Sequence, residues 1–324
     1  MMNVLLVGAL VHTTAALSAP VARTKVHRAQ LSMSTKSGAA ADTDTPLSVK
    51  AADAVIGTLF SIKPLFNMAK AKARSSMIEQ GMKIDVDWTK NVDSLLGDME
   101  SLSDEFDRLK NDKLVYPDYY LKPFHAYDEG NLSWQAAMEV ESAALTVHAP
   151  IYTPSRQELD RNGDFTLRDN FHRNMVRMLD ARGFKPKRIL DVGCSTGLST
   201  LKLASTFPAA EIVGIDLSPF MLAVAQHQRN TQFSGARVTY LHGCGEDSRL
   251  GTHDVDMVSM CLVSHELPAD ISRRVFEEAY RLLPEGGALS LMDMNPRSPF
   301  FQKFAANPFA FTAFKVRLSA WKNV

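Results

Sequence analysis

One short segment, from Arg188 to Gly197, constrains the fold of this chain more than any other. Residues 188–192 form a short, mostly apolar run that predicts a buried strand, and the glycine-containing turn Gly193 to Gly197 follows directly. A helix is expected to begin near Leu198. A strand that passes through a tight turn into a helix is typical of parallel α/β sheets, in which ligands bind beyond the carboxyl ends of the strands.

The region after Asp164 continues this alternation of helix and strand. One helix is predicted to start at the capping box of Thr166 and Asp169 and to end at Gly183. Five strands are predicted, at residues 188–192, 211–216, 237–241, 255–263 and 288–294. The fourth is apolar almost throughout, as expected for a strand buried on both faces. The sequence therefore predicts an α/β fold with a Rossmann-like, doubly wound, mainly parallel sheet.

From Tyr116 to Met138 the chain resembles plant and algal plastid-type methyltransferases, and the arrangement of strands and helices resembles that of class I methyltransferases. The resemblance rests on the D-x-G-x-x-x-G pattern from Asp191 to Gly197, on Asp216 at the end of the second strand, and on the turn at residues 281–287 before the fifth. It implies S-adenosyl-L-methionine as the cofactor. A dinucleotide is disfavoured, because the turn lacks the third glycine of G-x-G-x-x-G and a carboxylate before the first glycine would repel a pyrophosphate.

The resemblance also assigns cofactor-binding residues. Gly193 and Gly197 would let the backbone approach the methionine part of the cofactor, and Asp191 would orient its amino group, directly or through water. Asp216 would bind both ribose hydroxyls. Glu246 is the expected adenine contact, with backbone groups or a merely solvated loop acid as alternatives. The full predicted set is Asp191, Gly193, Cys194, Ser195, Gly197, Asp216, Leu217 and Glu246.

His265 and Glu266 directly follow the fourth strand and are the predicted catalytic residues. A histidine with an ordinary pKa could remove a proton from a hydroxyl, an amine or an acidic carbon. The alternative is that His265 caps the next helix or shapes the pocket. We expect no metal, because the nine histidines show no ligand spacing and the three widely spaced cysteines form neither a zinc motif nor a disulfide framework.

The balance of charged residues narrows the class of substrate that we expect. Lys and Arg total 36, and so do Asp and Glu, so the chain has no overall positive field to hold nucleic acid. We therefore expect a methyltransferase that acts on an O, N, C or S nucleophile of a small molecule. Two alternatives remain: a non-catalytic, S-adenosylmethionine-binding or regulatory protein, and a nicotinamide oxidoreductase.

Residues 1–41 have the composition of a targeting presequence, because they contain no Asp or Glu and several basic residues. The apolar run at residues 4–17 is followed by small residues, which predicts a cleavable hydrophobic segment. The bipartite pattern indicates a complex plastid, with the mitochondrion as the alternative.

The middle of the chain is expected to form an N-terminal, mostly helical extension at residues 42–113, in which Pro64 should kink or divide a helix. Its basic amphipathic helix either associates peripherally with a membrane or packs on the catalytic domain. Residues 114–163 are aromatic-rich and should form a lid or a packed connector. The methyltransferase domain takes residues 164–324, and its short end after Met294 suggests a truncated C-terminus.

Overall fold

The computed structural model describes residues 5–10, 63–122, 127, 129–153, 158–295 and 297–298. Its centre is a six-stranded sheet in the order β1-β6-β5-β2-β3-β4, in which every paired strand is parallel to its neighbour. The predicted parallel α/β fold is therefore confirmed. The strands are β1 (Leu5–Leu10), β2 (Arg188–Val192), β3 (Glu211–Asp216), β4 (Val238–His242), β5 (Met257–Cys261) and β6 (Ala288–Asp293).

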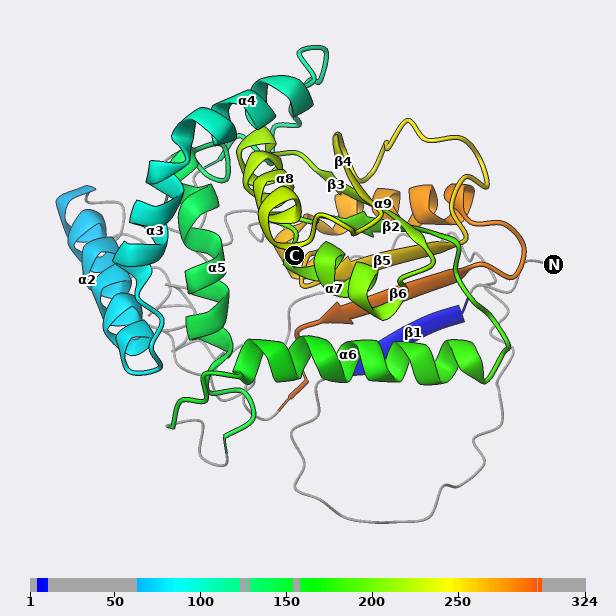
Figure 1. The fold of residues 1–324 in the computed structure, drawn as a ribbon, viewed down its shortest axis with the longest axis horizontal. Coiled ribbons are helices and arrows are strands. Elements are labelled where there is room, and N and C mark those ends of the chain that lie inside the picture. The colour runs from blue at the N-terminus through cyan, green and yellow to red at the C-terminus, as the bar shows by residue number, and fades with distance from the viewer. Residues whose placement is uncertain are drawn as a thin grey trace, which may run out of the picture.

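Helices cover both faces of the sheet (Figure 1). The helices α6 (Gly163–Asp180), α7 (Leu198–Thr206) and α8 (Pro219–Gln232) share one apolar core with the strands, and α9 (Ala269–Leu282) shares the other. The strand order reverses between β2 and β5, which are neighbours in space. In doubly wound sheets the ligand crevice opens at this switch point, beyond the carboxyl ends of the strands.

The first helix of this domain begins earlier than the sequence predicts. Asn162 is the N-cap of α6 and makes no side-chain capping bond, so the capping box of Thr166 and Asp169 is wrong. The helix starts where Gly163 packs against the end of another helix, since a Cβ at Gly163 would lie 2.3 Å from the carbonyl oxygen of His148. Close packing, rather than capping, sets this boundary.

The described part of the N-terminal extension is helical, as predicted, with α2 (Lys63–Met82), α3 (Trp88–Gly97) and α4 (Met99–Leu109). Pro64 lies in the first turn of α2, where its missing N–H costs no hydrogen bond, so the expected kink is absent from this helix. The helices α3 and α4 follow each other directly and are divided at Asp98. A further helix that the sequence did not predict, α5 (Trp134–His148), packs with α4 and α8 through Leu102, Ala136 and Met221.

Residues 5–10 belong to the predicted presequence, and in the full chain they form the edge strand β1, parallel to β6. The rest of the presequence and the residues after 298 lie outside the described residues, so cleavage and C-terminal truncation stay predictions.

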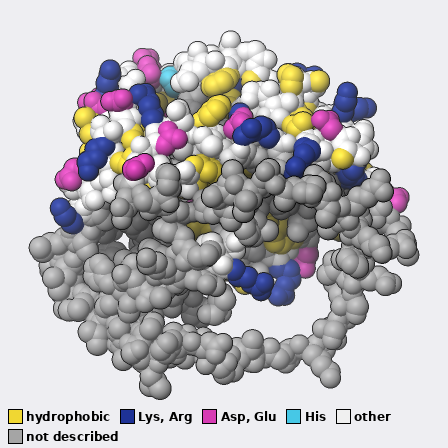
Figure 2. All heavy atoms as spheres, turned by 90° about the horizontal axis from the view of Figure 1, so that it is seen from below, with side chains coloured by type: hydrophobic (Ala, Val, Ile, Leu, Met, Phe, Trp, Pro, Cys, Tyr) yellow, Lys and Arg dark blue, Asp and Glu magenta, His cyan; other side chains and the backbone are white. Residues whose placement is uncertain are grey.

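No helix among the described residues is long and apolar enough to cross a membrane. Figure 2 shows basic and acidic side chains interspersed on the described part of one face.

Candidate functional site

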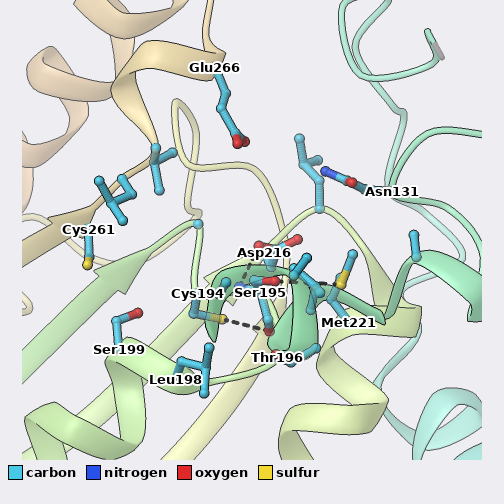
Figure 3. Close-up of a pocket in the computed structure, with 18 of the residues that line it drawn as sticks. Asn131, Cys194, Ser195, Thr196, Leu198, Ser199, Asp216, Met221, Cys261 and Glu266 are labelled. Carbon is cyan, nitrogen blue, oxygen red and sulfur yellow. Dashed lines mark hydrogen bonds between the residues drawn. The ribbon is translucent and has the colours of Figure 1, made fainter. Parts of the chain in front are cut away.

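A cavity of about 750 Å³ opens at the switch point of the sheet. The turn after β2 and the residues that follow β3, β4 and β5 form one wall, and α5 forms part of another. Figure 3 shows Ser195 and Asp216 close together at one side of this pocket, with Glu266 pointing across it toward them. Most of the predicted site residues meet here, namely Gly193, Cys194, Ser195, Asp216, Leu217, Glu246, His265 and Glu266.

Asp191 lies beneath the turn instead of lining the cavity. Its side chain is buried, and its Oδ2 accepts hydrogen bonds from Ser199 Oγ and Thr200 Oγ1, each at 2.7 Å. Burial raises the pKa of Asp191 to about 6, although the two hydroxyl donors act in the opposite direction. In this conformation Asp191 ties the end of β2 to the start of α7, and its contact with the cofactor, direct or through water, stays a prediction.

The two turn glycines are required for different reasons. Gly193 lines the cavity with a φ of +67°, and a Cβ there would lie 2.7 Å from Cγ2 of Val263. Gly197 has a φ of +87° and lies outside the cavity lining, where a Cβ would meet the Tyr240 hydroxyl at 2.5 Å and Ala225 Cβ at 3.2 Å. Packing against β4 and α8 thus demands a glycine at position 197, and the expected approach of Gly197 to the cofactor stays a prediction.

Asp216 ends β3 and faces the cavity, as predicted. Its Oδ2 accepts a hydrogen bond from the backbone N–H of Ser195 at 2.8 Å, and its Oδ1 accepts one from Ser218 N–H at 2.9 Å. The Tyr120 hydroxyl also donates to Oδ1, at 3.4 Å. Burial raises the pKa of this carboxyl group, and the two N–H donors offset part of that effect. The carboxylate is held in one orientation between the glycine turn and the start of α8.

The loop after α4 supplies a wall of the cavity through Tyr119 and Tyr120. The Tyr119 hydroxyl donates to the two carboxylate oxygens of Glu246, at 2.9 and 3.1 Å. Glu246 is only 9% exposed, so it is a buried, hydrogen-bonded residue and the solvated alternative is wrong. This part of the aromatic segment is therefore a wall of the pocket.

His265 lies in the short 3-10 helix η1 (Ser264–Glu266) that follows β5. Its Nδ1 is 2.6 Å from Oδ1 of Asp293, the last residue of β6, and its backbone N–H donates to Oδ2 of the same carboxylate at 3.1 Å. Burial disfavours the imidazolium, but the hydrogen bond to Asp293 and the charge of Glu266 outweigh it and raise the pKa of His265. Since Nδ1 bonds Asp293, proton exchange with an acceptor would use Nε2.

Arg168 of α6 places a fixed cation at the cavity wall. Its side chain is 12% exposed, Nε donates to Asp164 Oδ2 at 3.0 Å, and Nη1 donates to Cys261 Sγ at 3.4 Å. His148 Nδ1 also contacts Asp164, at 2.7 Å. Although burial acts in the opposite direction, the bond to His148 and the charge of Arg168 hold the pKa of Asp164 at about 2. The guanidinium is therefore anchored on one side and faces the cavity on the other.

Sequence reasoning placed Tyr119 and Tyr120 in the segment expected to form a lid or a connector, and it missed Arg168 and Asp293. A signal existed for Asp293, because it ends a predicted strand of a parallel sheet, as Asp216 does. Arg168 lies on a helix with no motif around it, and only the fold brings it to the cavity. Across the described ranges, no group of three or more His, Cys, Asp or Glu side chains is arranged to hold a metal ion.

Comparison with known proteins identifies the region around this cavity. Residues 189–287 match a family described as a methyltransferase domain. The match begins in β2 and ends just before β6, so it contains the glycine turn, Asp216, Glu246 and His265. This part of the chain is therefore similar to methyltransferase domains, and its strand order is the one that the resemblance to class I methyltransferases implies.

Curated relatives cover part of the chain. The ubiquinone biosynthesis O-methyltransferase of Pseudomonas savastanoi pv. phaseolicola is 33% identical over 146 residues, which are 44% of this chain and 60% of that protein. The demethylmenaquinone methyltransferase of Thermus thermophilus is 33% identical over 111 residues, 34% of this chain and 49% of that protein. The chain thus spans half to three-fifths of these relatives. Among solved structures, the PH0226 protein from Pyrococcus horikoshii OT3 has a TM-score of 0.39 at 15% identity, covering 54% of this chain and 69% of that one.

Proposed function

We propose that the protein is an S-adenosylmethionine-dependent methyltransferase that transfers a methyl group to a small-molecule acceptor by in-line displacement. The observation that carries this proposal is the fixed carboxylate of Asp216, hydrogen-bonded to Ser195 N–H at the switch point of the sheet. This pair lies within the matched methyltransferase domain. The relatives named above as methyltransferases support the same activity.

The residues of the cavity fit this cofactor. Asp216, Glu246 and Glu266 give the lining an anionic character that suits a sulfonium cation and an ammonium group. Arg168 would pair with the carboxylate of the cofactor's amino acid part, and Asp216 would accept hydrogen bonds from its ribose. The buried hydroxyl of Thr196, in the turn itself, has no hydrogen-bond partner among the described residues. It is thus a polar atom that a bound ligand can satisfy.

S-adenosylmethionine, when bound, supplies an electrophilic methyl group on a positively charged sulfur. The protein holds the acceptor in line with that group, and the walls formed by α5 and by Tyr119 and Tyr120 keep the reacting atoms away from water. When the methyl acceptor must lose a proton, His265 takes that proton, while Asp293 keeps the imidazole in the required tautomer. Little other acid-base chemistry is needed.

The proposed location is a plastid, supported by the acid-free, basic composition of residues 1–41 and by the resemblance to plastid-type members of the superfamily. A fluorescent protein fused to residues 1–62 should enter the plastid of an alga with complex plastids. Accumulation in mitochondria would favour the mitochondrial alternative.

Sedimentation of the full chain with anionic vesicles would test peripheral membrane association.

Thermal unfolding of the full chain tests the first requirement of the proposed activity, which is binding of the cofactor. A ligand that binds only the native state raises its stability, so S-adenosylmethionine and S-adenosylhomocysteine should each raise Tm while NAD should not. Transfer of a labelled methyl group to a mixed panel of small hydroxyl, thiol and amine acceptors then tests turnover. Binding without transfer to any acceptor would favour the non-catalytic alternative, and a shift with NAD alone would reject the cofactor.

A further inference from the structure

We propose that the acceptor is a neutral hydroxyl on an apolar body, of the phenol type, bound with its hydroxyl at His265 and its body along one face of α5. This inference rests on the proposed function and specifies its substrate class. Two separate parts of the cavity carry it: the pair of His265 and Asp293, and an apolar stripe on α5.

The first part is a histidine whose orientation is fixed. Both oxygens of Asp293 bond to His265, one to the ring and one to the backbone N–H, and Oδ1 also accepts from Met294 N–H at 2.7 Å. A carboxylate placed behind an imidazole in this way sets the tautomer and stabilises the protonated ring. Such a base is needed for a nucleophile that loses a proton as it reacts.

The charges around His265 distinguish between kinds of nucleophile. Glu266 Oε1 lies 3.8 Å from His265 Nε2, and Asp293 lies on the other side of the ring. These carboxylates would repel an anionic thiolate and would hold an alkylammonium group in its protonated, non-nucleophilic form. A neutral hydroxyl meets neither obstacle. Its proton passes to Nε2, its oxygen forms the bond to the methyl carbon, and the carbon–sulfur bond breaks with its electron pair going to sulfur; His265 then releases the proton to solvent.

The second part is the surface of α5 that faces the cavity. Its small apolar side chains recur at helical spacing and all line the cavity, at Ala136, Val140, Ala143, Ala144 and Val147. Met77 and Trp88 line the same half. The charged groups there pair with each other, since Arg74 Nη2 lies 2.5 Å from Glu139 Oε1 and the Tyr127 hydroxyl donates to Glu139 at 2.8 Å. This half of the cavity therefore favours an apolar body.

Matched probes test the proposal on the full chain. The probes 4-butylphenol, 4-butylbenzylamine and 4-butylthiophenol share one apolar body and differ in the nucleophile, and 4-(4-hydroxyphenyl)butanoate keeps the phenol but carries a charge. Calorimetry in the presence of S-adenosylhomocysteine measures binding without turnover, and labelled methyl transfer measures reaction. We expect 4-butylphenol to bind and to be methylated, with affinity rising about fourfold per methylene from 4-ethylphenol to 4-hexylphenol. The charged phenol should bind at least tenfold more weakly.

Variants separate the two parts of the site. Ala143→Trp should fill the stripe and weaken binding of 4-butylphenol at least tenfold while leaving the affinity for S-adenosylhomocysteine unchanged. Val147→Asp should also weaken binding of 4-butylphenol and leave the affinity for S-adenosylhomocysteine unchanged. Because Val147 is 53% exposed, this variant replaces Ala143→Trp if that protein fails to fold. Ala209→Trp, at an exposed position just before β3, is the matched control and should change neither affinity. Asp293→Asn should move the acidic limb of the kcat/KM profile to lower pH without weakening 4-butylphenol binding.

The outcomes separate this proposal from the function on which it rests. Preferred methylation of the benzylamine or the thiophenol, tighter binding of the charged phenol, or no binding of any phenol would overturn the proposed acceptor class while cofactor binding stands. An unshifted pH profile in Asp293→Asn would contradict the proposed role of Asp293 in setting the protonation of His265. Absence of S-adenosylmethionine binding to the folded chain would reject the proposed function itself, and the acceptor class with it.

Discussion

Replacing Gly193 with alanine should destabilise the protein by about 2–5 kcal/mol in the absence of any ligand. The residue has a φ of +67°, and a left-handed backbone costs a non-glycine residue about 1–2 kcal/mol. The new Cβ would lie 2.7 Å and 2.9 Å from the two Cγ atoms of Val263. Forcing an additional atom into such a packed site typically costs about 1–3 kcal/mol more.

Urea unfolding of the full chain measures this loss, and a second glycine provides the control. Gly183 has a φ of +64°, and a Cβ there would meet no described heavy atom within 4 Å, so Gly183→Ala should lose only the backbone part, about 1–2 kcal/mol. Val263→Ala in the Gly193→Ala background should recover the packing part. Equal losses at the two glycines would refute the packing contribution, and a fully stable Gly193→Ala would refute the whole argument.

Two other predictions concern a buried histidine and the tyrosine wall. Burial lowers the pKa of His172 to about 3, so the unfolded chain binds a proton that the folded protein does not as pH falls below about 6.5. This group therefore removes about 1.4 kcal/mol of stability per pH unit between pH 6.5 and 3. Urea unfolding at pH 7.5 and 5 should show that His172→Gln loses less stability on acidification than the original chain. An equal loss in the two proteins would contradict this role of His172. Tyr119→Phe should lower stability by about 1.5–3 kcal/mol, because the buried Glu246 loses its hydroxyl donor, and an unchanged Tm would show that this bond does not hold the wall.

The sheet was largely predictable because its strands are short apolar runs bounded by turn residues. Residues 188–192 and 211–216 form β2 and β3 with the predicted bounds, and the other three predicted strands differ by a few residues at their ends. The helix α5 escaped prediction because half of its buried residues are polar or charged, at Glu139, Ser142 and Thr146, and part of its apolar stripe lines a cavity, which weakens the periodic signal. Boundaries set by tertiary packing, such as the start of α6 at Gly163, leave no local mark in the sequence.

The candidate site was predictable where a local motif carries it. The resemblance placed Asp216 in the cavity, and the end of the fourth strand placed His265 there, but neither could show that Asp191 is buried beneath the turn or that Gly197 packs against β4 and α8. Contacts between distant segments were also invisible. Tyr119 is 127 residues from its partner Glu246, and only the folded chain brings them together.

Calorimetric titration of the full chain with S-adenosylmethionine, beside the Asp216→Asn variant, tests whether this cavity binds the cofactor through Asp216. We expect one binding site per chain and an affinity lower by roughly ten- to a hundredfold in the variant, because a hydrogen bond to a charged group contributes about 1.5–3 kcal/mol. NAD should give no binding heat with either protein. A folded chain that binds no S-adenosylmethionine, or a folded Asp216→Asn that binds it as tightly as the original, would contradict the assignment of this cavity.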